Sequence, residues 1–284
     1  MWGVLTLLGL VSQLVLSGTA FYYLYVRASF ATWRYKLNPK YPSAQHVKLE
    51  ITEMLKSLVF ATLCPAAALW LTQAGYGNAY CGLGGHSWTY LLGSTVGVVV
   101  VSDWFESTYH WAGHAVVSMW SVHKAHHRFP NPTPFAVIAD EAPDQLMRSL
   151  PLLAFPLLLP VNMDMLFVVY SVLFYAYGTY IHSGHSAPWI LSAHNGWINT
   201  SYHHYLHHAL SIKNKPYHIG FFIQAWDKLY GSQYDKDCFC IECQHSQGKR
   251  TQAEFAQVVV PDYSVLLSPS FWFDDPNPKL AKAH

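Results

Sequence analysis

Charged residues are scarce in this sequence. Only 12% of its 284 residues are Asp, Glu, Lys or Arg, whereas soluble domains contain about 25%. Hydrophobic residues make up 52% of the chain. The combination argues against a soluble domain and indicates an integral membrane protein. A basic excess is absent too: the formal net charge is +1 and the Lys and Arg residues are scattered, so we expect no nucleic-acid partner.

Cysteine is rare, and its distribution is unlike that of a disulfide-stabilised domain. Cys64 and Cys81 stand alone, and three more cysteines lie in the stretch CFCIECQH. An odd number with three of the five clustered argues against a disulfide framework. The stretch has the look of a small metal site, but C-x-C-x-x-C is irregular spacing for zinc. We interpret Cys238, Cys240 and Cys243 as reduced surface cysteines.

Long apolar stretches occur four times, at about residues 2–26, 51–73, 89–115 and 146–181. Each of the first three is close to the ~20 residues that a membrane-spanning helix needs. The first has no basic n-region or persuasive cleavage site, so we expect a retained anchor. The fourth is too long for one crossing and is interrupted by three prolines, which predicts a helical hairpin. The predicted fold is an all-α integral membrane protein with about four transmembrane helices.

Basic residues follow the first apolar stretch but are absent from the next loop, AGYGNAYCGLGGHS. Those that follow the first stretch are Arg27, Arg34, Lys36, Lys40 and Lys48. Because cytosolic loops carry the excess of Lys and Arg, this bias places residues 28–50 in the cytosol. Counting crossings from there puts every dense histidine cluster on the cytosolic side, in a histidine-rich cap.

Histidine is abundant where charge is not. Twelve of the 17 histidines lie between positions 110 and 208, mostly in tight spacings. YHWAGH contains His110 and His114, HKAHH contains His123, His126 and His127, HSGH contains His182 and His185, and HHYLHH contains His203, His204, His207 and His208. At helical spacing, His110 and His114 project from one face. Asp103 and Glu106 share that stripe and are expected to accept imidazole N–H bonds.

A hydrogen-bonded core position explains one buried histidine but not about ten. Neutral imidazoles in a poorly charged membrane protein need hydrogen bonds or ligands, and protonated ones repel one another. Metal ions resolve both problems, since imidazole binds Fe, Zn, Cu and Ni. More ligands are available than one ion takes, so we infer two metal ions.

An all-histidine site favours redox catalysis. A structural zinc site closes with about four ligands, usually including cysteine. Two irons with open positions could activate dioxygen and attack an unactivated C–H bond of a lipid. A histidine-rich membrane metal-binding or transport protein is the non-enzyme alternative. Such a protein is expected to place its histidines or carboxylates within the spans, whereas these clusters lie at the ends of spans.

The motif order H-x-x-x-H, H-x-x-H-H, H-S-G, H-H-x-x-H-H, followed by AWDKLYGS, resembles the fatty acid hydroxylase/sterol desaturase superfamily of membrane di-iron oxygenases. The match covers roughly residues 95–235. The resemblance implies a multi-pass protein of the endoplasmic reticulum membrane that uses O2, with electrons from NAD(P)H through cytochrome b5 and its reductase. Because no cytochrome b5-like segment lies within the chain, electrons are expected from a separate protein.

The same resemblance implies catalytic iron ligands. They carry over to His110, His114, His123, His126, His127, His182, His204, His207 and His208. His185 and His203 are two further candidate ligands. Asp103 stands at a position where family members have an acidic residue. Trp226 and Asp227 are expected to brace the cap. Asp227 is also expected to lie next to the metal ligands.

Two segments, NPTPFAVIADEAPDQLMRSLP and INTSYHHYLHH, look most like the sterol C-5 desaturase branch (lathosterol oxidases). The chain departs from it in Ala142, where members have His before Pro, and in the unusually acidic ADEAPD. We predict an O2-dependent sterol C-5 desaturase-like enzyme. Hydroxylation or methyl oxidation of a sterol, terpenoid or fatty-acyl lipid remains the alternative. The expected domains are a membrane anchor at 1–90, a catalytic domain at 91–235 and a cytosolic C-terminal cap or tail at 236–284.

Overall fold

The computed structural model describes residues 1–273, in which every regular element is a helix. No β-strand forms in this part of the chain, where pairing is limited to isolated bridges such as Lys36 with His185. The predicted all-α fold is therefore confirmed. The last eleven residues of the predicted C-terminal tail, 274–284, lie outside the described residues.

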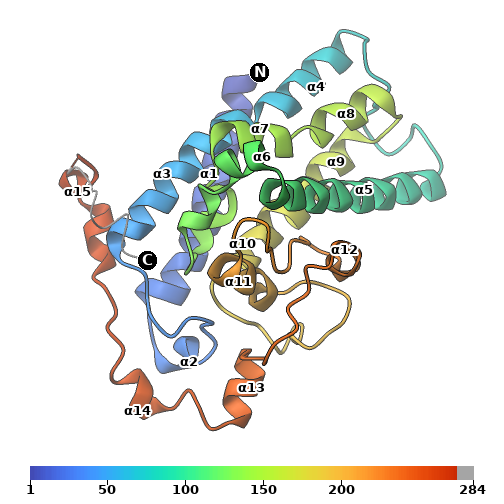
Figure 1. The fold of residues 1–284 in the computed structure, drawn as a ribbon. Coiled ribbons are helices and arrows are strands. Elements are labelled where there is room, and N and C mark those ends of the chain that lie inside the picture. Colours follow the sequence, from blue (N-terminus) through green and yellow to red (C-terminus); the bar gives the residue numbers. More distant parts are fainter. Residues whose placement is uncertain (274–284) are drawn as a thin grey trace.

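The N-terminal layer consists of two long helical segments that run side by side (Figure 1). Helix α1 (Trp2–Phe21) ends in a π-helical turn, Tyr22–Val26. Helix α3 (Ala44–Ala61) starts at Ser43, whose hydroxyl accepts the His46 N–H, and it leads through Thr62 into α4 (Leu63–Gln73). Pro65 has no N–H to bond to the preceding turn, which explains the break between α3 and α4.

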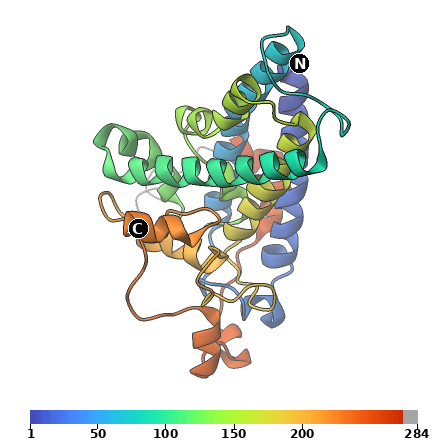
Figure 2. The same cartoon turned by 90° about the vertical axis from the view of Figure 1, so that its right-hand side faces the viewer.

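The longest helix, α5 (Trp88–Ala115), lies across the direction of α1 (Figure 2). Ser87 caps its start by accepting the Tyr90 N–H at 3.3 Å. Val116 adopts an extended conformation and ends the helix, and α6 (Val117–His123) begins at once. Because α5 and α6 pack against each other, the ends that carry the first two histidine motifs meet.

Residues 146–181, predicted as a helical hairpin, form two helical arms of unequal length joined at residues 159–162. After α7 (Ala142–Arg148), the first arm is only α8 (Pro151–Leu158), which packs against α4. The second arm is continuous through α9 (Met163–Val169), a π-helical stretch (Tyr170–Ala176) and α10 (Tyr177–Ile181). Eight residues of helix extend about 12 Å, so α8 is too short to cross a bilayer.

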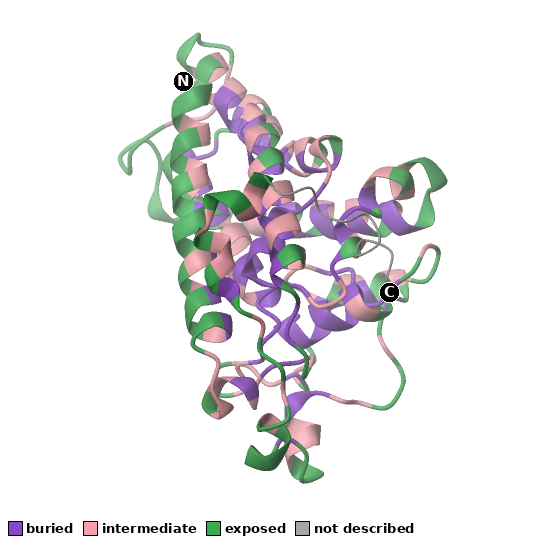
Figure 3. Cartoon of the chain, turned by 90° about the vertical axis from the view of Figure 1, so that its left-hand side faces the viewer, coloured by how far each residue is buried: buried purple, intermediate pink, exposed green. Residues whose placement is uncertain are grey.

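Three helical segments of the described chain are long and apolar enough to cross a membrane: Trp2–Val26, Ala44–Gln73 and Met163–Ile181. The predicted stretch 89–115 is helical but is not one of them. Figure 3 shows that one side of α1 is largely exposed, and Val4, Leu7 and Val15 on it are each more than 60% accessible. An apolar surface of that extent fits contact with lipid rather than with water.

The C-terminal third wraps the end of the bundle with short helices. Helix α11 (Ser201–Leu210) packs against α10 and is buried over most of its length. Gly231 ends α12 (Gln224–Tyr230) in a left-handed conformation (φ 65°), which an L side chain adopts only at a cost. The remaining elements are α2 (Phe30–Trp33), α12 (Gln224–Tyr230), α13 (Ile241–Ser246), α14 (Gln252–Phe255), α15 (Pro269–Phe273) and 3₁₀ turns at His126–Arg128, Pro134–Ile138 and Tyr263–Leu267.

Candidate metal centre

Nine of the predicted ligands meet in two adjacent groups, in each of which one ring nitrogen per residue lies within 4.8 Å of the others. Group A consists of His110, His114, His123, His127 and His207. Group B consists of His126, His182, His204 and His208. Members of group A lie up to 97 positions apart in the sequence, from His110 to His207. Only the packing of α5, α6, α10 and α11 brings the histidines together.

Each H-x-x-H-H motif divides its histidines between the two groups. His123 and His127, four residues apart, go to group A, while His126 between them goes to group B. In α11 the assignment is reversed, because His204 and His208 go to group B and His207 goes to group A. The spacing therefore presents an i,i+4 pair to one group and a single ring to the other. Two ligand groups side by side follow from this alternation.

Backbone carbonyls orient several of these rings. The Nδ1 atoms of His110 and His207 lie 3.0 and 2.7 Å from the carbonyl oxygens of Ile219 and Tyr217, and His182 Nδ1 lies 2.8 Å from that of Gly178. A carbonyl only accepts, so the proton is on Nδ1 and the lone pair is on Nε2. The free nitrogen of each ring is therefore the one that points into its group.

The inward nitrogens of the two groups meet other imidazole nitrogens or no partner at all: His207 Nε2 lies 3.1 Å from His127 Nε2, and His182 Nε2 lies 2.7 Å from His204 Nε2. In group A the buried Nε2 atoms of His110 and His114 have no hydrogen-bond partner, and the Nδ1 of His114 lies 3.3 Å from the Ile212 carbonyl oxygen. Burial lowers the pKa of His207 well below its usual value, so protonation is not available to relieve the repulsion. Several neutral imidazole lone pairs facing one another fit a transition-metal ion. The residues of the two groups therefore fit a bound metal ion.

Two carboxylates hold rings of the two groups. Asp144 Oδ2 lies 3.1 Å from His123 Nδ1, and Asp140 Oδ1 lies 2.8 Å from His126 Nδ1. Burial by itself raises the pKa of Asp144, but Arg148 and the hydrogen bond from His123 outweigh it and hold that pKa below its usual value. The sequence did not predict that either carboxylate contacts a histidine ligand, although both belong to the unusually acidic segment ADEAPD.

The three acidic residues expected beside the ligands have other partners. Asp103 accepts the N–H groups of Phe222 and Ile223 and the indole N–H of Trp226, at 2.8, 3.1 and 2.8 Å. Glu106 pairs with Arg148. The expectation that these two accept imidazole N–H bonds is corrected: they bind α5 to the segment before α12 and to α7.

Asp227 has the bracing position expected of it. It accepts hydrogen bonds from the Gly220 N–H at 3.0 Å, the Ser232 hydroxyl at 2.8 Å and the Asn199 amide at 2.8 Å. Its carboxylate lies 3.9 Å from His218 Nδ1, and no histidine of group A or group B is among its partners. Asp227 therefore ties α12 to Asn199, just before α11, and to Gly220, in the segment that follows α11.

His185 and His203 lie outside both groups. The Nδ1 of His203 accepts the Thr200 N–H at 2.9 Å, which closes a capping box at the start of α11. The Nδ1 of His185 lies 3.0 Å from the Ser183 carbonyl oxygen, and its ring meets Tyr25 edge to face. Burial lowers the pKa of both rings to about 3, so both are neutral. Their positions indicate helix capping and core packing.

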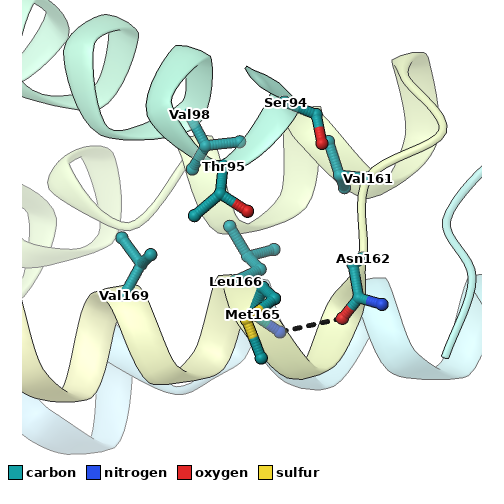
Figure 4. Close-up of a pocket in the computed structure, with 8 residues that line it drawn as sticks. All are labelled: Ser94, Thr95, Val98, Val161, Asn162, Met165, Leu166 and Val169. Atoms are coloured by element: carbon teal, nitrogen blue, oxygen red, sulfur yellow. Dashed lines mark hydrogen bonds between the residues drawn. The ribbon is translucent and has the colours of Figure 1, made fainter. Parts of the chain in front are cut away.

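Two cavities of the described chain lie apart from the histidines. Figure 4 shows a crevice between α5 and α9, with Thr95 and Val98 facing Leu166. It encloses about 10 Å³, which is room for about one water molecule. A groove of about 860 Å³ lies between residues 33–43 and 239–261. Neither cavity is lined by a member of group A or group B, so the expected lipid cavity at the histidines is not one of these two.

A close approach at Gly113 predicts a sensitive position. A Cβ there would lie 3.0 Å from two ring atoms of His123. We expect Gly113→Ala to displace the His123 ring and to lower the iron bound per chain, measured by elemental analysis of the purified protein. Gly97→Ala in the same helix is the control, since a Cβ there meets nothing within 4 Å. Equal iron content in both variants would contradict the prediction.

Comparison with known proteins agrees with the motif order. Residues 95–232 match the fatty acid hydroxylase family. This segment of the chain belongs to that family. Its boundaries agree with those expected from the motifs, and the expectation of an oxidoreductase of this superfamily is confirmed. No solved structure matches the chain.

Several curated proteins are similar over most of the chain. Lathosterol oxidase of Rattus norvegicus is 28% identical over 239 residues, which cover 78% of this chain and 74% of the relative. Lathosterol oxidase of Mus musculus is 30% identical over 189 residues, 66% of this chain and 60% of the relative. A Delta(7)-sterol 5(6)-desaturase of Schizosaccharomyces pombe is 27% identical over 91% of this chain and 76% of the relative.

Proposed function

We propose that this fatty acid hydroxylase-family protein is an O2-dependent di-iron oxidoreductase that introduces a double bond into a sterol-like lipid, as a sterol C-5 desaturase does. The observation that carries the proposal is the pair of largely buried, all-histidine groups in a chain with three apolar helices long enough to cross a membrane. The names of the similar proteins, lathosterol oxidase and Delta(7)-sterol 5(6)-desaturase, suggest the substrate class.

We assign the nine histidines of groups A and B as the iron ligands. His185 and His203 are left out of this assignment, because neither ring lies in group A or group B. Bound iron would supply the redox chemistry that an unactivated C–H bond requires, which zinc does not. The protein's own contribution is to keep the Nε2 atoms free and aimed at the ions. The carbonyls of Ile219 and Tyr217 and the carboxylates of Asp140 and Asp144 do this from outside each group.

The overall reaction consumes one O2 and two electrons for each lipid. In desaturation, a CH–CH unit, O2, two electrons and two protons give C=C and two waters. In hydroxylation, one C–H bond, O2, two electrons and two protons give C–OH and one water, and the neighbouring C–H bond is kept. Electrons are expected from NAD(P)H through cytochrome b5 and its reductase. Burial of the two groups keeps bulk water away from the reacting positions.

The membrane arrangement is part of the proposal. The N-terminal pair of apolar segments and Met163–Ile181 would cross the endoplasmic reticulum membrane, and α5, which lies across α1, would be a further apolar helix beside them. The histidine groups would face the cytosol, where cytochrome b5 docks. Residues 1–90 would form the anchor, 91–235 the catalytic domain and 236–284 the cap.

Expression in yeast that lacks its own sterol C-5 desaturase tests the function. We expect conjugated 5,7-diene sterols, detected by ultraviolet absorbance and mass spectrometry, in cells with this chain. The matched control is His207→Ala, which removes a group A ring, and it should yield no diene. Absence of diene from a chain that binds about two irons would contradict desaturation at this position and favour hydroxylation of another lipid. A chain that binds iron without O2-dependent NADH consumption would favour the metal-binding alternative.

A further inference from the structure

A third cluster of metal-binding side chains lies away from the histidine groups. His194, Cys238, Cys240 and Cys243 each offer one ligand atom, and these four atoms lie within 4.8 Å of one another. The sulfur atoms of Cys240 and Cys243 each lie 3.4 Å from His194 Nε2. Three thiol groups and one imidazole therefore converge on one point, although 44 residues separate His194 from the first cysteine.

The spacing of these atoms matches a tetrahedral zinc site. Zinc binds sulfur at about 2.3 Å and nitrogen at about 2.0–2.1 Å, so tetrahedral ligands S and N lie roughly 3.5 Å apart. The two 3.4 Å separations agree with this value. Three cysteines with one histidine is a common ligand set of structural zinc sites, and four protein ligands leave no open position for a substrate.

We propose that His194, Cys238, Cys240 and Cys243 bind one zinc ion that has a structural role. The proposal is independent of the lipid oxidation assigned to groups A and B. It replaces our interpretation of these cysteines as unconnected surface thiols.

Contacts around the cluster hold the ligands in place. Glu242 accepts the Ser192 hydroxyl at 2.6 Å and the Ala193 N–H at 2.9 Å, and the Ser192 oxygen accepts the His194 N–H at 3.0 Å. The first turn of α13 thus orients the loop that carries His194. At the start of α13, the sulfur of Cys240 accepts the Cys243 N–H at 3.5 Å, which fixes the position of this sulfur relative to α13.

The proposed site connects three parts of the chain. Cys238 contacts the Tyr202 hydroxyl of α11 at 3.5 Å, and the same hydroxyl accepts the Phe239 N–H at 3.2 Å. The ion would therefore hold the loop before α11 and the start of α13 against the helix that carries H-H-x-x-H-H. Since metal binding contributes to folding, losing the ion should loosen the C-terminal cap.

His245, the histidine next to these cysteines in sequence, is not part of the cluster. Its Nε2 lies 3.0 Å from the Arg34 carbonyl oxygen, and its ring meets Tyr35 edge to face. Although His245 belongs to the stretch CFCIECQH, its ring packs on the segment around Arg34 and Tyr35. His194 is brought to the cysteines by the loop that Glu242 holds.

Cobalt substitution of the full-length purified protein tests the site. Thiolate ligands give Co²⁺ an intense sulfur-to-metal charge-transfer absorption, which the all-histidine groups A and B cannot produce. We expect this band in the unaltered chain and in Cys81→Ser, whose thiol lies outside the cluster. Cys243→Ser and His194→Ala should weaken or shift it, and zinc content should fall by about one ion per chain.

Two results would overturn the proposal. One is the absence of the charge-transfer band from the unaltered chain after reduction of its thiols, a result that does not depend on any variant's folding. The other is a Cys240–Cys243 disulfide in freshly purified protein without zinc, which would make the pair a redox motif. Desaturase activity in yeast bears on groups A and B and decides neither outcome.

Discussion

Replacing His207 with glutamine should remove the metal of group A and abolish lipid oxidation, whereas the same change at His203 should preserve both. The two histidines are one turn apart in α11, yet their nitrogens differ in function. The Nδ1 of His207 is held by the Tyr217 carbonyl and its other nitrogen joins group A. The Nδ1 of His203 caps the helix, and glutamine can form the same capping box.

The expected loss at His207 is large. Loss of an outer hydrogen-bond partner of a metal ligand costs roughly 10- to 100-fold in metal affinity or activity, so loss of the ligand itself should cost more. Iron per chain and diene sterol per cell are the two measurements. His86→Ala, at an exposed loop position outside both groups, controls for loss of any histidine. If His203→Gln lost iron as His207→Gln does, the exclusion of His203 from the ligands would be wrong.

Changing Asp144 to asparagine should weaken group A, and changing Asp140 should weaken group B. Asp144 hydrogen-bonds the outer nitrogen of the His123 ring, and Asp140 lies 2.8 Å from the outer nitrogen of the His126 ring. Each negative charge increases the basicity of the nitrogen that faces the metal. Asparagine keeps the shape and removes the charge. We expect each variant to lose iron roughly 10- to 100-fold faster to a chelator, at one of two ions only.

Double variants distinguish the two groups. Adding Asp144→Asn to His207→Gln should cause no further loss of iron, because both changes act on group A. Adding Asp140→Asn to His207→Gln should remove the second ion as well, because the effects of changes at independent sites are additive. Glu141→Gln is the control, because this neighbouring carboxylate pairs at the surface with Arg128. Identical behaviour of the two double variants would show that the carboxylates do not serve separate groups.

Local patterns made several features predictable from the sequence. Low charge and long apolar runs indicated membrane helices because a bilayer requires about 20 apolar residues for a crossing. The i,i+4 spacing of His110 with His114 placed both rings on one helix face. The histidine motifs in their order indicated the family and the metal. Each of these signals is contained in a short stretch of chain, so no tertiary contact was needed to recognise it.

Tertiary packing alone decided how those residues are used. The partners of Asp103 lie about 120 residues away, and the carboxylates of Asp140 and Asp144 reach the histidines only because α6 packs against α7. The division of His126 from His127, and of His207 from His208, depends on which neighbouring helix each ring meets. His194 meets its cysteines across 44 residues. The sequence by itself determined a membrane-embedded histidine-rich metalloenzyme, and long-range contacts, which leave no local pattern, decided which side chains form each group and which support it.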